Sequence, residues 1–137
     1  MKELHTVINR INLSLTLLLL PFLLSASDSK KETVTLEVSA TAYNSVPEQT
    51  DDTPFEAAWG DILDPEVKSI AVSSDLLDMG LTKNTRVKIE GLPGEYLVLD
   101  KMNKRWEKKI DIYMGTDIQE ARNWGIKKVT IRWVATP

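Results

Sequence analysis

Two aspartates mark the segment of this 137-residue chain in which chemistry is easiest to place. Asp100 and Asp111 lie near the two ends of LDKMNKRWEKKIDIYMG, which is otherwise rich in lysine and arginine. Each stands in an apolar, strand-like run, where aspartate is disfavoured. Paired carboxylates with a tryptophan between them suit carbohydrate chemistry, since one acid can protonate a glycosidic oxygen and an aromatic ring can stack on a sugar. On composition alone, a solvated basic loop with two incidental acids is the more common arrangement.

The run KIDIY predicts which side chains share a face with Asp111. Ile110 and Ile112 project to one side of a strand, and Lys109, Asp111 and Tyr113 project to the other. If the polar face lines a groove, partial burial raises the pKa of Asp111, whereas the charge of Lys109 lowers it. The pattern leaves open which effect is larger, and whether this face meets a groove or solvent.

The N-terminal segment predicts export. Lys2 and Arg10 precede the apolar run Leu13–Leu24, and the small residues Ser25-Ala26-Ser27 follow it, as in a secretory signal peptide. We therefore expect a signal peptide over residues 1–26, a flexible lead-in over 27–32, one domain over 33–137, and a periplasmic or extracellular location. The apolar run falls short of the roughly 20 residues that span a bilayer, so no stable membrane insertion is expected after cleavage; an uncleaved anchor is the alternative.

The residues left after cleavage exclude several classes of function. The sequence has no cysteine, and its one histidine, His5, would be removed with the signal peptide. Thiol nucleophiles, histidine triads and conventional zinc sites are thereby excluded, and we predict no metal and no cofactor. Proton chemistry would fall to Asp, Glu, Lys or Tyr. Fifteen basic and 19 acidic side chains would remain, a net charge of about −4, so no nucleic-acid partner is predicted.

Periodicity predicts an all-β domain with one or two short helices. A strictly alternating run over 33–43 is the clearest strand, and a helix over 117–124 ends at Gly125. A single helical turn over 74–80 and a long loop over 44–54 complete the pattern. Short strands of this spacing favour a small closed or nearly closed β-barrel. The predicted strands are 33–43, 69–72, 85–90, 95–100, 109–113 and 128–134.

The four tryptophans are assigned to the core by default. Trp133 alternates with two apolar residues of the last predicted strand and is expected to be buried. Trp59, Trp106 and Trp124 carry no pattern of their own, and tryptophan is more often a core residue than a ligand platform.

A series of short motifs resembles a known family. Their order and spacing over about Val38 to Trp133 are similar to those of the three-aspartate (3D) domain, a six-stranded double-psi β-barrel of bacterial cell-wall proteins. That family includes membrane-bound lytic transglycosylase A and stationary-phase or resuscitation-type proteins. The motifs are Thr41-Ala42-Tyr43, Ile70-Ala71-Val72, Val98-Leu99-Asp100, Ile110-Asp111-Ile112-Tyr113, and Ala121 with Trp124-Gly125.

The resemblance implies a reaction and a partner. Asp111 matches the family's single catalytic acid and base, and Asp100 matches the aspartate that supports it. The implied reaction cleaves the MurNAc–GlcNAc β-1,4 bond of peptidoglycan glycan strands and closes a 1,6-anhydro ring without water. Residues around the two aspartates are expected to bind the substrate, namely Thr41, Tyr43, Lys101, Arg105 and Tyr113.

The chain departs from the family pattern at two places. Ser73 or Ser74 stands where the family has its first aspartate, with Asp75 displaced, and Lys101-Met102 replaces a frequent Thr-Gly.

The alternatives to a glycan-cleaving enzyme are a non-catalytic glycan-binding module, and a periplasmic interaction domain that binds a protein through its basic loop. A monomer is the expected oligomeric state.

Overall fold

The computed structural model describes residues 30–46, 53 and 55–137. The predicted signal peptide, half of the lead-in and much of the predicted loop over 44–54 lie outside these residues. Within the described part of the chain, no helix combines the length and apolar character needed to cross a membrane.

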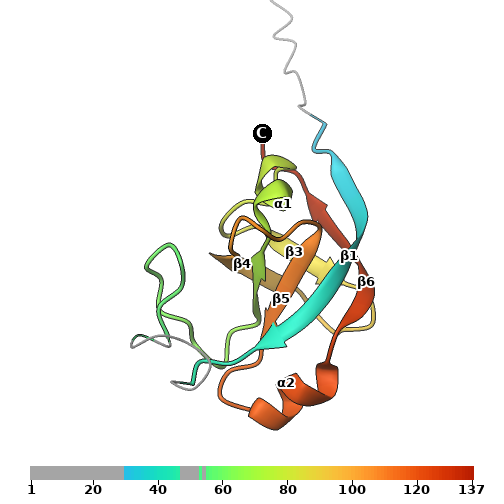
Figure 1. Ribbon diagram of the computed structural model, residues 1–137. Coiled ribbons are helices and arrows are strands. Elements are labelled where there is room, and N and C mark those ends of the chain that lie inside the picture. Colours follow the sequence, from blue (N-terminus) through green and yellow to red (C-terminus); the bar gives the residue numbers. More distant parts are fainter. Residues whose placement is uncertain (1–29, 47–52, 54) are drawn as a thin grey trace, which may run out of the picture.

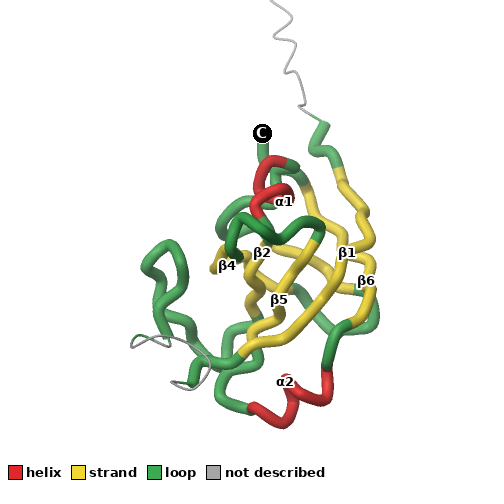
Figure 2. Tube along the Cα trace, in the orientation of Figure 1, coloured by secondary structure: helices red, strands yellow, loops and turns green. Residues whose placement is uncertain are grey.

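Six strands close into a single barrel of mixed parallel and antiparallel pairs, which confirms the predicted fold class (Figure 1). The strands follow one another around the barrel in the order β1-β5-β2-β4-β3-β6. Two short helices lie at opposite ends of the barrel (Figure 2). The elements are β1 (Thr33–Tyr43), β2 (Ser69–Val72), α1 (Ser74–Asp78), β3 (Arg86–Ile89), β4 (Tyr96–Lys101), β5 (Lys109–Tyr113), α2 (Ile118–Trp124) and β6 (Lys127–Val134).

The alternating sequence pattern fills the barrel with branched side chains. Each strand turns its apolar positions inward and its polar positions outward. Leu76 of α1 and Leu81 after it join the same buried cluster. The buried strand residues are Val38, Ala40, Ile70, Val72, Val87, Ile89, Tyr96, Val98, Ile110, Ile112, Val129, Ile131 and Trp133.

The strand order has an internal twofold symmetry. It is unchanged when β1 is exchanged with β4, β2 with β5, and β3 with β6. The exchange also maps the parallel pair β1–β5 onto the parallel pair β2–β4, and α1, which follows β2, onto α2, which follows β5. Strands β2 and β5 pair with each other at the centre of this arrangement, so residues near their midpoint lie where the two halves of the barrel meet.

A β-bulge in β4 decides which way Asp100 points. Ile70 pairs with Val98, but the next residue, Ala71, pairs with Asp100, so Leu99 is an extra residue in the strand. Simple alternation would turn Asp100 into the barrel beside Val98. The bulge places it in register with outward-facing Ala71 instead, in keeping with the use of bulges to redirect side chains.

Candidate functional site

A row of four residues crosses the outer face of the barrel. Thr41 of β1 pairs with Asp111 of β5, Asp111 pairs with Ala71 of β2, and Ala71 pairs with Asp100 of β4. Residues in register on neighbouring strands share a face of the sheet, so the structure brings both predicted aspartates to one surface. They lie two strands apart, a Cα separation of about 9–10 Å by ordinary strand spacing, with Ala71 of β2 between them in the register.

Asp111 is half-buried and has one neutral hydrogen-bond donor. The Thr41 hydroxyl donates to its Oδ1 at 3.0 Å. Burial raises the pKa of Asp111; the Thr41 hydrogen bond and the charge of Lys109 oppose this shift, and the charge of Asp100 adds to it. The effect of burial on the pKa of Asp111 is therefore larger than the effect of the Lys109 charge, which the sequence alone did not decide. A carboxyl with a raised pKa retains its proton to higher pH and is a better general acid.

Asp100 is held by three hydrogen bonds. The Tyr43 hydroxyl donates to its Oδ2 at 3.2 Å, and the backbone amides of Ala58 and Lys101 donate to its Oδ1 at 2.7 and 2.9 Å. Burial and the nearby charge of Asp100 raise the pKa of Tyr43 far above its usual value, so this phenol stays protonated and remains a donor. The two aspartates thus have different roles available, one fixed as an acceptor and one able to carry a proton.

A small apolar cluster flanks the row on one side, next to Tyr43. Ala57 and Leu63 pack with Tyr113, and Tyr43 and Leu99 pack against them. The rings of Tyr43 and Tyr113 lie 5.4 Å apart between centroids. The cluster joins the segment between β1 and β2 to the barrel and brings the Ala58 amide to Asp100. Both predicted tyrosines therefore lie beside the aspartates, as Thr41 does.

The other side of the row carries cations and an exposed aromatic ring. The ammonium of Lys109 lies 3.6 Å from the centroid of the Trp106 ring, and the guanidinium of Arg105 lies 4.9 Å from it. Trp106 is 36% exposed, so the expectation that it belongs to the core is wrong. The turn that carries Trp106 projects from the barrel between β4 and β5. Contacts with the two cations, instead of packing in the core, stabilise the ring there.

The other predicted residues are accounted for as follows. Arg105 is exposed and belongs to the cation–tryptophan cluster, whereas the exposed Lys101 reaches Asp100 through its backbone amide. Trp133 is buried, as predicted, and Trp124 is partly buried, with its indole N–H donating to the Ala40 carbonyl at 3.3 Å. Within the described residues, no group of three or more histidine, cysteine, aspartate or glutamate side chains could hold a metal ion.

Ser73, one of the two serines predicted to stand in place of an aspartate, has a structural role. Ser73 is buried, and its hydroxyl accepts a hydrogen bond from the Lys109 amide at 3.0 Å. Asp75 accepts from the Lys108 amide at 2.8 Å. Although burial alone would raise the pKa of Asp75, hydrogen bonds from Ser73 and Lys108 lower it overall. Both residues therefore tie the start of α1 to the start of β5, and neither belongs to the row.

Several contacts of the site could not be found by pattern. The hydrogen bond from Tyr43 to Asp100 joins residues 57 positions apart, and the Ala58 amide comes from an irregular segment. Ala71 lies inside the motif Ile70-Ala71-Val72, but its position between the two aspartates depends on the bulge. The only sequence signal for the position of Ala71 is that it is a small residue between two larger ones.

Comparison with solved structures identifies barrels of similar shape. The Streptomyces papain inhibitor aligns with a TM-score of 0.51 and 17% identity, covering 74% of this chain and 94% of the inhibitor. An apo expansin of Clavibacter michiganensis aligns with a TM-score of 0.49 and 20% identity, over 76% of this chain and 52% of the expansin. A variant of that expansin in complex with cellohexaose aligns at 0.40 and 18%, over 76% and 51%.

At 17% identity, the similarity to the papain inhibitor shows the fold alone. The chain spans about half the length of the expansins that it matches. No family model matches the sequence, and no curated protein does so either. The closed barrel expected from the resemblance is confirmed, whereas membership of the three-aspartate family stays a prediction.

The two aspartates should affect stability in opposite directions. A carboxyl whose pKa is raised by folding contributes stability at acidic pH, and that contribution is lost as the pH rises through the folded-state pKa. Asp111→Asn should therefore raise the melting temperature at pH 7 by a few degrees, since about 1 kcal/mol corresponds to roughly 4–8 °C in a domain of this size. The gain should vanish below the ordinary aspartate pKa of about 3.9.

Asp100→Asn is the matched control for this measurement. It weakens three hydrogen bonds to a charged acceptor, so the melting temperature at pH 7 should fall, by an amount equivalent to about 1–2 kcal/mol. Thermal unfolding followed by circular dichroism between pH 3 and pH 8 measures both effects. A lower melting temperature of Asp111→Asn at pH 7 would contradict the assignment of Asp111 as the destabilised carboxylate.

Proposed function

We propose that this chain binds peptidoglycan glycan strands on the outer face of β1, β5, β2 and β4. The observation that supports the proposal is the in-register row Thr41–Asp111–Ala71–Asp100, with the exposed ring of Trp106 beside it. Carboxylates accept hydrogen bonds from sugar hydroxyls, and aromatic faces pack against the apolar faces of sugar rings. Both kinds of group are found on this face of the barrel.

The cations on the Trp106 side of the row favour an anionic glycan over a neutral one. Arg105 and Lys109 lie against Trp106, and the preceding turn adds exposed lysines. Muramoyl units carry acidic peptide stems, whose carboxylates could pair with these side chains. Export through the predicted signal peptide is part of the same proposal, since the glycan lies outside the cytoplasm.

Glycan cleavage is a second candidate, favoured by the raised pKa of Asp111. Its carboxyl proton would pass to the glycosidic oxygen as the C1–O bond breaks. The C6 hydroxyl of the same sugar would then bond to C1 and give its proton to the Asp111 carboxylate. The acid is regenerated and no water is consumed, so one carboxyl is enough. The three hydrogen bonds on Asp100 suit a supporting charge better than a proton donor.

Removal of the exposed aromatic ring should weaken binding without disturbing the fold. Trp106→Ala should reduce the affinity for purified sacculi about tenfold, which corresponds to the ~1.4 kcal/mol expected of one stacked ring. Co-sedimentation with sacculi measures this. Ile126→Ala is the control, because Ile126 is also an exposed apolar side chain but lies between α2 and β6. Equal binding by the two variants would contradict the proposed binding surface.

Cleavage is tested by the products released from the same sacculi. If Asp111 is the acid, the parent protein should release 1,6-anhydromuropeptides and Asp111→Asn should release at least 100-fold less, in line with the loss of a general acid. Product release by the parent should decline as the pH rises through the Asp111 pKa, because the protonated form is required. Sacculus binding without any product from the parent would leave the binding module and exclude the enzyme.

A further inference from the structure

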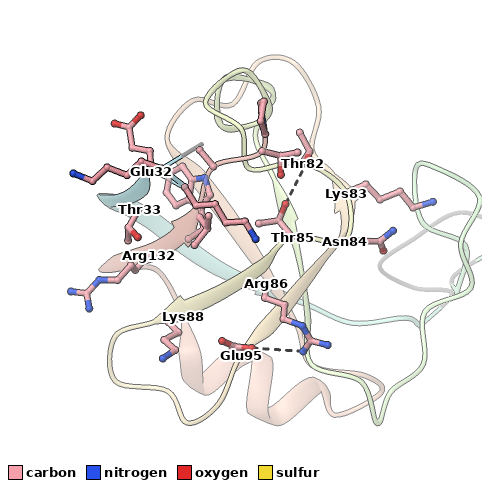
Figure 3. Close-up of a pocket in the computed structure, with 17 residues that line it drawn as sticks. Glu32, Thr33, Thr82, Lys83, Asn84, Thr85, Arg86, Lys88, Glu95 and Arg132 are labelled. Carbon is pink, nitrogen blue, oxygen red and sulfur yellow. Dashed lines mark hydrogen bonds and ion pairs between the residues drawn. The ribbon is translucent and has the colours of Figure 1, made fainter. Parts of the chain in front are cut away.

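A second surface of the barrel concentrates positive charge. It surrounds a hollow of about 1050 Å³ whose walls include β3 and the end of β6 (Figure 3). Four of the six strands carry the aspartate row, so β3 and β6 lie on the far side of the barrel from it. Two acidic side chains, Glu32 and Glu95, line the hollow. Six basic ones do so: Lys30, Lys31, Lys83, Arg86, Lys88 and Arg132. This excess is unexpected in a chain of net charge −3.

Two hollows meet at this surface. Lys88, Glu95 and Arg132 line the first hollow and also a second one of about 720 Å³, which continues along the turn between β3 and β4. The shared residues make the two hollows one trough along the outer face of β3 and β6. We name this surface the β3–β6 trough. The trough is larger than the binding site of a single small ion would be.

Lys88 and Arg132 form a like-charged pair at the junction. They lie directly opposite each other in the antiparallel register of β3 and β6, where side chains are about 4.5–5.5 Å apart at Cβ and like charges are destabilising. The Nε of Arg132 donates to the Thr35 hydroxyl at 3.4 Å. The two terminal nitrogens of the guanidinium do not take part in this hydrogen bond. One oxyanion could accept hydrogen bonds from both cations at this spacing.

The acidic residues nearby do not neutralise this pair. Among the described residues, ion pairs join Lys83 to Asp61 at 2.7 Å and Arg86 to Glu95 at 3.7 Å, and neither includes Lys88 or Arg132. Figure 3 shows the Arg86–Glu95 contact and Lys83 pointing away from it. Lys88 and Arg132 therefore offer donors without an acidic partner among the described residues.

We infer that the β3–β6 trough binds a linear polymer with repeated oxyanion groups, with one phosphate or carboxylate bridging Lys88 and Arg132. Repeated anions suit the basic side chains that the lead-in, the strand β3 and the strand β6 bring to one surface. This site is independent of the aspartate row, since the two share no residue and lie on opposite sides of the barrel. The protein would thus hold two ligands at once.

Binding of a medium-chain inorganic polyphosphate to the purified protein tests the inference, by fluorescence anisotropy at about 0.1 M salt. The parent should bind saturably, and Lys88→Gln and Arg132→Gln should each weaken binding at least tenfold. Lys128→Gln is the matched control, because Lys128 is exposed on the same strand and lines neither hollow. It should change the affinity less than twofold. Poly-L-glutamate in a parallel titration shows whether phosphate or carboxylate is preferred, and either preference supports the inference.

Relief of the like-charge repulsion gives a second readout that does not need the ligand. Lys88→Gln should raise the melting temperature of the free protein at low salt, and the gain should disappear at high salt. Addition of polyphosphate should raise the melting temperature of the parent more than that of Lys88→Gln. The inference is overturned if polyphosphate does not bind, or if Lys128→Gln weakens binding as much as Lys88→Gln does.

Discussion

The antiparallel pairing of β2 with β5 is the constraint on which the site depends. It sets Ala71 opposite Asp111, and the parallel strands on either side then bring Thr41 and Asp100 into the same row. A shift of one residue in β5 would turn Asp111 into the barrel and two isoleucines out of it. Burial of a carboxylate without partners is strongly unfavourable, so the apolar residues of β5 fix the position of the acid as well as the core.

The same geometry separates the environments of two chemically identical side chains. Asp100 accepts hydrogen bonds from two backbone amides and a phenol, whereas Asp111 has one hydroxyl partner and a pKa raised by burial. Burial favours the protonated form of Asp111, while three donors hold the Asp100 carboxyl in one orientation. The same arrangement suits binding alone, because both carboxyl groups can contact sugar hydroxyls.

The sequence predicted the barrel and half of the site. Strict alternation located β1 and β5, and with them the shared face of Lys109, Asp111 and Tyr113. Alternation alone would have buried Asp100, since nothing in YLVLDK marks the bulge. The exposure of Trp106 was also missed, because cation–π contacts within a turn leave no periodic signal. Contacts to Tyr43 and Ala58 arise from closure of the barrel, which brings distant segments together in a way that local pattern does not record.

Two opposite faces of one small barrel thus carry different chemistry. Carboxylates lie on the face of β1, β5, β2 and β4, and the like-charged pair of Lys88 and Arg132 lies on β3 and β6. The central claim is that glycan binds to the first face. Backbone amide chemical shifts, followed by NMR during titration with a soluble peptidoglycan oligosaccharide, test it most directly. Glycan binding on this face predicts saturable shifts at Thr41, Ala71, Asp100, Trp106 and Asp111. Shifts confined to β3 and β6, or none at saturating oligosaccharide, would contradict it.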